Sequence, residues 1–340
     1  MHATLRAPRY VADGEGAVRP DCPLVSVVIC VYNAGVYFRP SLLSILGQTY
    51  DHLDILIIDD GSTDGCVEGV QDLLSDPRVR LFRQANAGKS AALNRALDEA
   101  RGLFYAVHDA DDISHPRRVE VQLRALLERP DVAAVFCGHE IIFEGRTMAP
   151  IEAARSEAEC SRAIAAFRQP AHDPTAFYRM SSVDSLRYDT TLQCCEGLDY
   201  ILRVGERHSM LVVGECLYGY RILPTSLTRR DPAWRQGFVA VALQRACGRR
   251  GLDYAALFPN GPPGPRRSRR SSQDNNLAAN FIVSVLSQRQ HGRWWDALTT
   301  GLLCARLQPL DFQYYKALIY ALLPAPAIRL LRRRGERSRA

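Results

Sequence analysis

The segment LFYAVHDADD, residues 103–112, joins a short apolar run to three carboxylates. Its first five residues have the composition of a buried β-strand, and Asp109, Asp111 and Asp112 follow directly after it. Neighbouring carboxylates repel one another, and a nearby cation normally offsets this repulsion. A hard divalent cation such as Mg²⁺ or Mn²⁺ suits one or two carboxylates combined with phosphate oxygens. The alternative is a polar loop whose aspartates cap a helix that begins near Pro116.

Strand-like and helix-like patterns alternate on both sides of this segment. We predict buried strands at 25–31, 54–58, 79–82, 103–107 and 131–137, and helices at 42–46, 67–74, 91–101 and 116–128, with Gly102 closing the third helix. This alternation predicts an α/β fold with a right-handed, doubly wound and mostly parallel sheet. Ligands bind such sheets at the carboxyl ends of the strands, where Tyr32-Asn33, Asp59-Asp60 and the carboxylates of 109–112 fall.

The charge of the chain is concentrated in two late segments. At 340 residues, 47% hydrophobic and 24% charged, the chain has the composition of a globular enzyme with room for more than one domain. Segments 266–274 and 329–339 carry +3 and +5, whereas the net charge of the whole chain is +6, so the remainder carries about −2. A nearly neutral body argues against nucleic-acid binding and favours, at most, a local anionic partner.

Cysteine usage and hydropathy bear on the compartment. The ten cysteines include no CxxC pair and no regular disulfide framework, so we expect a reducing, cytoplasmic location. Residues 1–22 lack the apolar core of a secretory signal, and we expect them to form a flexible tail. No run reaches the roughly 18 apolar residues that a membrane-spanning helix needs.

Several motifs between residues 24 and 120 resemble, in order and spacing, those of the family 2 glycosyltransferases. They are the opening strand 25–33, Gln48-Thr49-Tyr50, residues 58–64, residues 86–94, and the DxD element Asp109-Ala110-Asp111-Asp112 with Pro116 and Arg117 after it. Cys30 stands where the family usually has Pro. The resemblance implies the GT-A fold, a Rossmann-like nucleotide-sugar-binding domain, here followed by a C-terminal helical extension.

The resemblance also implies a division of the chain by role. Residues 23–130 are expected to form the donor-binding half of the GT-A domain, and residues 131–230 the acceptor-binding half. Residues 231–340 are expected to be a helical region that contains a basic, Pro- and Arg-rich linker at 259–276. Helices are predicted within it at 277–286, 294–307 and 312–323.

For the donor, the resemblance implies that Val31, Tyr32, Asn33 and Asp60 line the base and ribose of a nucleotide sugar. Asp60 is expected to accept the imino proton of uracil. The alternative for Asp60 is an Asx turn at Gly61, and Asp59 is the structural partner beside it.

Further along the chain, Gly88 allows close backbone approach, and Lys89 offers a cation to base or phosphate. The alternative for Lys89 is a solvated lysine at the start of a helix.

The DxD element is expected to hold a divalent cation. Asp111 should ligate the metal, Asp109 should face the metal or the ribose, and Ala110 should lie against the donor. A divalent cation acting as a Lewis acid stabilises the charge that develops on the leaving diphosphate. Asp112 is expected to cap the helix near Pro116, and His108 either packs in the core or lies near the site.

The acceptor segment departs from the family at one position. Glu196, Asp199 and Arg203 fit the family motif, but Gly197 stands where its second carboxylate, usually the general base, is expected. An inverting transfer needs a carboxylate to take the proton of the acceptor hydroxyl. We predict Glu196 for this role because it adjoins the vacant position and its side chain is long. Asp199 is the other candidate, unless it pairs with Arg203 one helical turn later.

Residues 218–228 resemble the family's loop that closes over the donor. Arg221 could contact the diphosphate, and Leu223 replaces a His that often precedes Pro in this loop. The sequence has no QxxRW motif, so addition of a single sugar is expected. The basic segment 327–339 suits an anionic membrane surface. The alternative is that the C-terminal helices form a cap packed on the catalytic domain, with a solvated basic end.

The predicted function is therefore a metal-assisted, inverting transfer of a hexosyl or N-acetylhexosaminyl unit. The donor is expected to be a UDP-sugar, and the acceptor a glycan or lipid-linked saccharide of polysaccharide biosynthesis. The alternative is a non-catalytic protein that keeps the GT-A fold, either as a nucleotide-sugar-binding protein or as a scaffold. Gly197 and Leu223 favour that alternative, and the intact pair Asp109 and Asp111 speaks against it.

Overall fold

A computed structural model describes residues 22–143, 145–147, 154–223, 232–262 and, between 278 and 324, all but 279, 280, 283, 287, 290, 291, 308, 310 and 311. It divides into two compact units. Unit 1 comprises 1–140, 151–221 and 233–262, and unit 2 comprises 141–150, 222–232 and 263–340. The expectations for the tail 1–21, the loop 224–228, the basic part of the linker from 263 onward and the terminus 327–339 lie outside the described residues.

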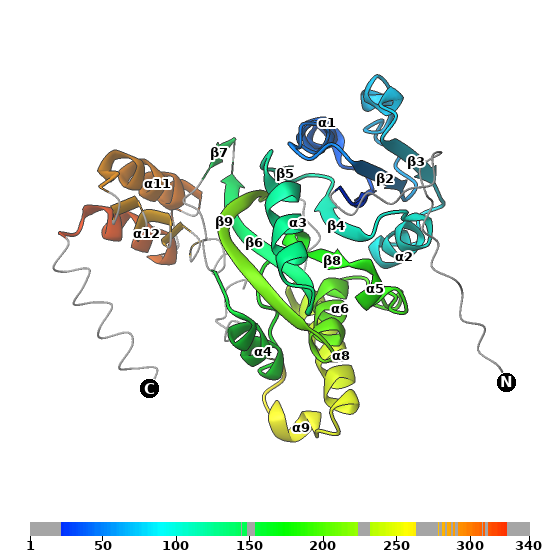
Figure 1. Cartoon of the computed structure of the whole chain (residues 1–340). Coiled ribbons are helices and arrows are strands. Elements are labelled where there is room, and N and C mark those ends of the chain that lie inside the picture. The colour runs from blue at the N-terminus through cyan, green and yellow to red at the C-terminus, as the bar shows by residue number, and fades with distance from the viewer. Residues whose placement is uncertain are drawn as a thin grey trace. The chain divides into compact units, whose positions relative to one another are not determined.

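A mixed sheet forms the centre of unit 1 (Figure 1). The parallel strands β3 (Val79–Arg83), β2 (Leu53–Asp59), β1 (Val25–Val31) and β4 (Phe104–Asp109) lie side by side in that order. The sheet continues through β8 (Phe177–Arg179), β6 (Val132–Phe143), β9 (Ser209–Arg221) and β5 (Ile113–Ser114). Antiparallel pairs join β8 to β4 and to β6, and β5 to β9. The predicted α/β fold is confirmed. Its parallel part consists of β3, β2, β1 and β4.

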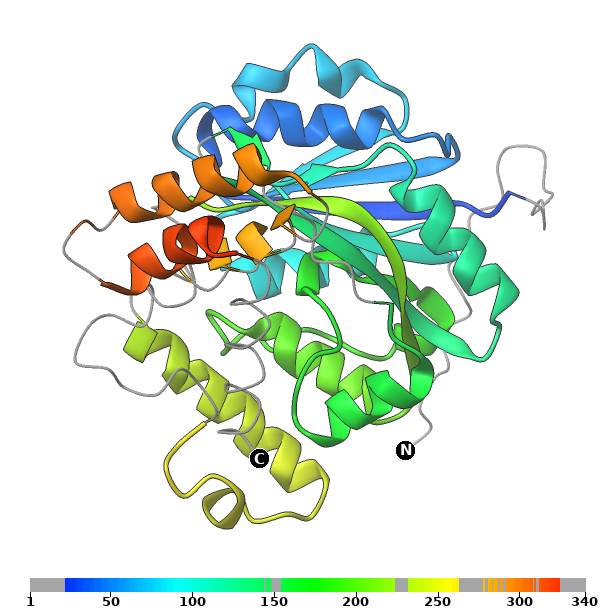
Figure 2. The same cartoon turned by 90° about the vertical axis from the view of Figure 1, so that its left-hand side faces the viewer.

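Helices cover both faces of this sheet, as Figure 2 shows, which explains why β2 is buried along its whole length. On one face lie α1 (Phe38–Leu46) and α3 (Arg118–Glu128), whose buried apolar side chains belong to one core cluster with those of β1 and β2. On the other face lie α2 (Lys89–Glu99), α4 (Glu157–Ala165), α6 (Glu196–Gly205) and α8 (Pro232–Arg249). The short helices α5 (Met180–Val183) and α9 (Tyr254–Leu257) complete unit 1.

Some predicted elements have different bounds. The predicted helix 67–74 is wrong: it is two 3₁₀ turns, η2 (Glu68–Val70) and η3 (Leu73–Ser75), because Gly69 disfavours a continuous α-helix. Helix α2 ends before Gly102, which is not its cap. A Cβ at Gly102 would stand 2.5 Å from the backbone nitrogen of Ser26, so glycine is needed there for close packing against β1. Strand β6 runs six residues beyond the predicted end at Cys137.

Unit 2 contains the predicted C-terminal helices. Helices α11 (Trp294–Leu307) and α12 (Phe312–Leu322) pack against each other (Figure 1), and Gly301 permits this, since a Cβ there would lie 2.7 Å from the Cα of Leu318. The two-residue strand β7 (Arg146–Thr147) pairs with the end of β6. Within the described ranges, no helix is both long and apolar enough to cross a membrane.

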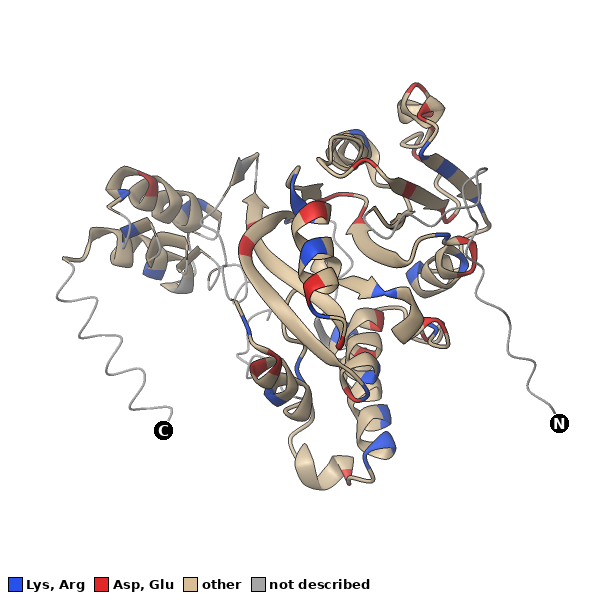
Figure 3. Cartoon of the chain, in the orientation of Figure 1, with Lys and Arg blue, Asp and Glu red and all other residues tan. Residues whose placement is uncertain are grey.

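Positive and negative residues are interleaved on the ribbon, as Figure 3 shows along α3. Glu120 and Arg124 on that helix form an ion pair at 2.8 Å. This mixture agrees with the nearly neutral charge that the sequence predicts for the body of the chain.

Candidate active site

The carboxyl ends of β1, β2 and β4 meet at one edge of the sheet. In the strand register Val31 pairs with Asp59, and Cys30 pairs with Asp109. The backbone nitrogen of Asp60 donates a hydrogen bond to the carbonyl of Val31 at 2.9 Å. The clusters that the sequence places after these strands are therefore neighbours in space.

The loop after β1 is tied to the loop after β2. Asn33 adopts a left-handed conformation (φ 50°), and its side-chain oxygen accepts a hydrogen bond from the Thr63 nitrogen at 2.7 Å. The Asn33 nitrogen donates to the Ser62 hydroxyl at 3.1 Å. Tyr32 remains 53% exposed, so its ring is available to a planar ligand.

Asp60 and Asp59 have separate structural roles. The buried Asp60 carboxylate accepts hydrogen bonds from the side chain of Gln84 and from the backbone nitrogens of Ala87 and Gly88, at 2.8–2.9 Å. Asp59 instead closes the turn, since its Oδ1 accepts from the Ser62 nitrogen at 2.8 Å. Asp60 therefore fixes the loop that leads into α2, and its contact with a base stays a prediction.

Lys89 lies between carboxylates from two other elements. Its Nζ is 2.7 Å from Oδ1 of Asp109 on β4 and 3.6 Å from Oε1 of Glu196 on α6. Gly88 just before it has φ 88°, a conformation that favours glycine and starts the helix here. Burial lowers the pKa of Lys89, but Asp109, Glu196 and Asp173 outweigh it and hold that pKa well above the usual value. Lys89 is therefore an ion-paired lysine at the start of α2, with 32% of its side chain exposed, and its contact with a base or phosphate stays a prediction.

The two carboxylates of the DxD element fit a divalent cation. Burial and the charge of Asp109 raise the pKa of Asp111 to about 6, which indicates a site where added positive charge would be favourable. Among the residues that the structure describes, no group of three or more His, Cys, Asp or Glu side chains forms a complete metal site. Asp109 and Asp111 would therefore share a cation with phosphate and water oxygens.

Asp112 fastens the DxD loop to β9. Its fully buried carboxylate accepts hydrogen bonds from the Tyr218 hydroxyl at 2.8 Å and from the Arg221 nitrogen at 2.7 Å. The Tyr218 oxygen in turn accepts from the Asp109 nitrogen at 3.1 Å. The expectation that Asp112 caps the next helix is therefore wrong, because β9 brings these donors to it through long-range pairing. Burial and the charges of Asp111 and Asp109 raise the pKa of Asp112 well above its usual value.

Arg221 and Ala110 lie at the same loop. The Arg221 Nε donates to the carbonyl of Asp111 at 2.8 Å, and its guanidinium stands 4.9 Å from the centre of the Tyr37 ring. Ala110 is buried, with 7% of its surface exposed. The structure thus brings Arg221 to the DxD loop, and its contact with a diphosphate stays a prediction.

His108 packs in the core. Its ring nitrogens lie 2.9 Å from the Ser41 hydroxyl and 3.1 Å from the Ser114 hydroxyl, and it is 1% exposed. Burial and the nearby charge of Arg118 lower the pKa of His108 to about 3. This neutral, enclosed imidazole links α1 to β5 and is closed to a ligand.

The two predicted base candidates on α6 have different surroundings. Glu196 faces Lys89, whereas Asp199 is 2% exposed and held by two arginines. Its oxygens accept from Arg203 Nε at 2.9 Å and from Arg249 Nη1 at 3.3 Å. The pairing of Asp199 with Arg203 is thus confirmed. Asp199 does not join the group that Lys89 forms with Asp109 and Glu196, which we call the Lys89 cluster.

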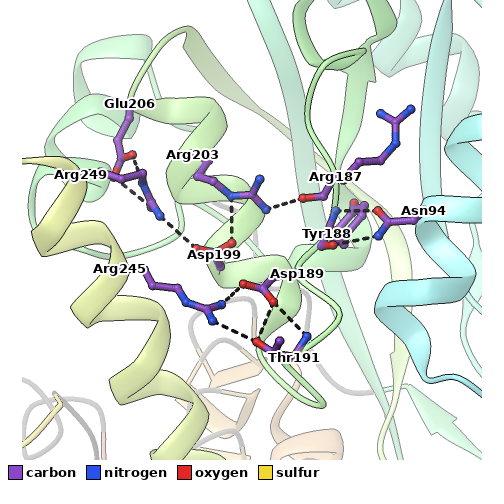
Figure 4. A network of polar contacts seen from close by, with 10 residues as sticks. All are labelled: Asn94, Arg187, Tyr188, Asp189, Thr191, Asp199, Arg203, Glu206, Arg245 and Arg249. Carbon is purple, nitrogen blue, oxygen red and sulfur yellow. Dashed lines mark hydrogen bonds and ion pairs between the residues drawn. The ribbon is translucent and has the colours of Figure 1, made fainter.

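Figure 4 shows that this pairing belongs to a wider network. Arg249 of α8 also binds Glu206 at 2.7 Å, and Arg245 of the same helix pairs with Asp189. Arg203 donates to the carbonyl of Arg187 at 2.7 Å. The network joins α6 to α8 and to the chain segment before α6.

Sequence reasoning missed Asp173. It begins the 3₁₀ turn η4 (Asp173–Thr175), and a Cβ placed on Gly197 would lie 2.0 Å from its Oδ2 and 2.1 Å from its Cγ. The side chain of buried Arg118 positions this turn, donating to the carbonyl of Pro174 at 2.8 Å. The signal that could have pointed to Asp173 was Gly197 itself, because a missing side chain leaves space for a neighbour.

Residues 26–188 match the family model described as Glycosyl transferase family 2. This region is therefore a glycosyltransferase domain, and it belongs to glycosyl transferase family 2. Among curated proteins, it is similar to the uncharacterized glycosyltransferase YibD of Escherichia coli (strain K12), with 45% identity over 105 residues. That match covers 31% of this chain and 30% of YibD, and matches to other curated relatives also cover less than half of their lengths.

Several solved structures share the fold. The structure of S. aureus TarS 1–349 in complex with UDP-GlcNAc aligns with a TM-score of 0.54 and 17% identity, covering 88% of this chain and 79% of that chain. The mannosyltransferase PcManGT from Pyrobaculum calidifontis, in complex with GDP-Man and Mn²⁺, aligns with a TM-score of 0.51 and 19% identity. The alignment covers 88% of this chain and 85% of that chain. The expected GT-A fold is confirmed.

Proposed function

We propose that this protein is a metal-assisted, inverting glycosyltransferase that uses a nucleotide-diphosphate sugar. The observation that carries the proposal is the position of Lys89, between Asp109 of the DxD element and Glu196. Lys89 and Asp109 lie within the family 2 match, and Glu196 follows it. The ammonium group of Lys89 lies near the carboxyl ends of the parallel strands, where a diphosphate ligand would bind. The carboxylates around it could take part in proton transfer.

The donor-binding roles follow the arrangement of the loops. Asp111 and Asp109 would hold the divalent cation, which would supply Lewis-acid stabilisation of the departing diphosphate. Lys89 and Arg221 add fixed positive charge beside the same loop. We assign the base and ribose contacts to Val31, Tyr32, Asn33 and Asp60, and further contacts with the donor to Gly88 and Ala110.

We propose a UDP-sugar donor carrying a hexosyl or N-acetylhexosaminyl unit. Support comes from the motif resemblance and from the structural neighbour TarS, whose complex contains UDP-GlcNAc, whereas PcManGT is described with GDP-Man. The proposed acceptor is a glycan or lipid-linked saccharide of polysaccharide biosynthesis. A carboxylate on or beside α6 would take the acceptor proton, with Glu196 as the candidate that faces the cluster and Asp199 held by arginines.

We place this activity in the cytoplasm, with peripheral contact to a membrane through the basic segment 327–339. The ten cysteines are all free thiols, which suits a reducing compartment. Six arginines against one glutamate in that segment suit anionic lipid head groups.

The first test is calorimetric titration of the full chain with UDP, GDP and CDP, each with Mn²⁺ and with EDTA. We expect metal-dependent binding of UDP, at least tenfold weaker in Asp111→Ala because the diphosphate loses its bridging cation. The matched control is Asp131→Ala, which removes a 58% exposed carboxylate paired with Arg129 and should bind UDP normally.

The other outcomes are equally informative. Metal-dependent binding of GDP in place of UDP would support the metal-assisted mechanism and would identify the donor as a GDP-sugar. Absence of binding to any nucleotide, with or without metal, would refute the donor site. It would make a non-catalytic scaffold that keeps the fold, without nucleotide binding, the leading alternative.

A further inference from the structure

We propose that Asp173 is the catalytic base that removes the proton from the acceptor hydroxyl. This inference rests on the proposed function and identifies the proton acceptor of that same site. Asp173 lies on a different chain segment from both candidates that the sequence suggests on α6, Glu196 and Asp199.

The position of Asp173 is complementary to Gly197. A Cβ on Gly197 would fall 2.0–2.3 Å from the three atoms of the Asp173 carboxylate. No side chain at position 197 could coexist with Asp173 in this place. The Asp173 carboxylate therefore lies where a side chain from the first turn of α6 would otherwise begin.

The backbone around Asp173 is held firmly. Arg118 donates to the carbonyl of Pro174, and Gln122 donates to the carbonyl of Thr175, both at 2.8 Å. Both donors come from the buried face of α3, and the proline restricts the backbone of the turn. A base held in this way needs little reorganisation before proton transfer.

Asp173 is also the carboxylate best able to accept a proton. Its side chain is half-buried, and burial rather than a bonded partner is the largest influence on its pKa. Asp109 is paired with Lys89, Glu196 lies 3.6 Å from the same lysine, and Asp199 is held by two arginines.

The surrounding charges suit this role. Burial raises the pKa of Asp173 to about 7, with Lys89 lowering it and Glu196 and Asp109 raising it. A base is most effective when its pKa lies near the working pH. The neighbouring His172 is a poor competitor, since burial and His139 hold the pKa of its ring well below the usual value.

The proposed step balances as a single displacement. The acceptor oxygen forms a bond to the anomeric carbon while its proton passes to a carboxylate oxygen of Asp173. The bond from the anomeric carbon to the diphosphate oxygen breaks, and its electron pair leaves with the nucleoside diphosphate.

The test measures release of UDP from UDP-glucose and UDP-N-acetylglucosamine in Mn²⁺, with water as the acceptor. We expect Asp173→Asn to lower kcat by a factor on the order of 10²–10⁴ while the Kd for UDP changes by less than about twofold. We expect Glu196→Gln to lower kcat by less than about tenfold. The wild-type rate should rise with pH through about 7, and Asp173→Asn should lack that rise.

A relocation experiment separates a base from a structural residue. In Asp173→Ala the space beside α6 is free, and adding Gly197→Asp should recover at least tenfold in kcat. The matched control, Asp173→Ala with Gly197→Ala, fills the space without a carboxylate and should recover nothing.

Three results would overturn the inference. They are an Asp173→Asn variant with at least half of the wild-type kcat, a larger loss in Glu196→Gln than in Asp173→Asn, and equal recovery by both relocation variants. Each would leave the proposed glycosyltransferase in place. A wild-type protein that neither binds UDP nor releases it from either sugar would overturn the proposed function as well.

Discussion

At the scale of single residues, Lys89 balances carboxylates from three elements. Asp109 lies 2.7 Å away, Glu196 lies 3.6 Å away, and Asp173 contributes a further negative charge to the same lysine. One positive charge does not neutralise three negative ones, so the cluster favours a proton or a cation ligand. Because of this imbalance, we expect binding of a proton or a cation at the site to stabilise the folded protein.

The ionisation of Asp173 predicts a dependence of stability on pH. Its pKa in the folded protein is raised to about 7, so the folded state keeps a proton that the unfolded chain has lost. The free energy of unfolding should therefore fall as pH rises from about 4 to about 7. Asp173→Asn removes this penalty, and we expect its Tm in EDTA to exceed that of the wild type by roughly 2 °C at pH 8.

Scanning calorimetry between pH 5 and pH 8 checks this prediction. The excess in Tm should grow with pH, and Asp131→Asn, on an exposed ion pair, serves as the control with no such trend. An Asp173→Asn protein that is less stable than the wild type at pH 8 would contradict it.

At the scale of elements, α6 carries two different functions on its first turns. Glu196 points into the Lys89 cluster, whereas Asp199, three residues later, joins α6 to Arg249 of α8 (Figure 4). Residues three apart on a helix share a face only in part, which allows one turn to serve both a site and a structural network.

We expect Asp199→Asn to destabilise the protein because Arg203 and Arg249 lose a shared buried partner. The arginines are partly exposed, so the loss is on the order of 2 kcal/mol, or roughly 5 °C in Tm. The folded fraction should keep its Kd for UDP.

Thermal unfolding beside a UDP titration checks this expectation. Asp98→Asn removes an exposed partner of Arg187 and should change Tm far less. A normal Tm combined with a large loss of kcat in Asp199→Asn would instead indicate a catalytic role for Asp199.

At the scale of the whole molecule, the basic charge resides in segments 266–274 and 329–339 rather than in the body. Each basic residue near an anionic surface contributes about 1 kcal/mol to binding. The terminal segment is the stronger of the two, with six arginines and one glutamate.

We therefore expect the full chain to bind phosphatidylglycerol-containing vesicles in low salt. Reversing Arg332, Arg333 and Arg334 to Glu should weaken this binding at least tenfold. The matched control reverses Arg266, Arg267 and Arg269, which changes the net charge equally and should weaken binding less. Equal effects in a vesicle sedimentation assay would assign the binding to net charge and contradict a terminal docking segment.

The sequence by itself determined the parallel core and the polar residues at its edge. Buried strands such as β2 depend on runs of apolar residues that are local in the chain, and Asp60, Lys89, Asp109 and Asp111 follow or flank such elements at short range. The helix predicted over 67–74 was wrong because Gly69 weakens a short helix.

Only the tertiary structure decided which carboxylates meet. Asp112 bonds to Tyr218 and Arg221, Asp199 to Arg249, and Asp173 fills the space beside Gly197. These contacts join residues that are far apart in the chain, and their geometry depends on how whole elements pack. Local sequence patterns do not reveal that packing. In the sequence, Gly197 therefore indicates a missing carboxylate, whereas in the structure the carboxylate of Asp173 fills the space beside it.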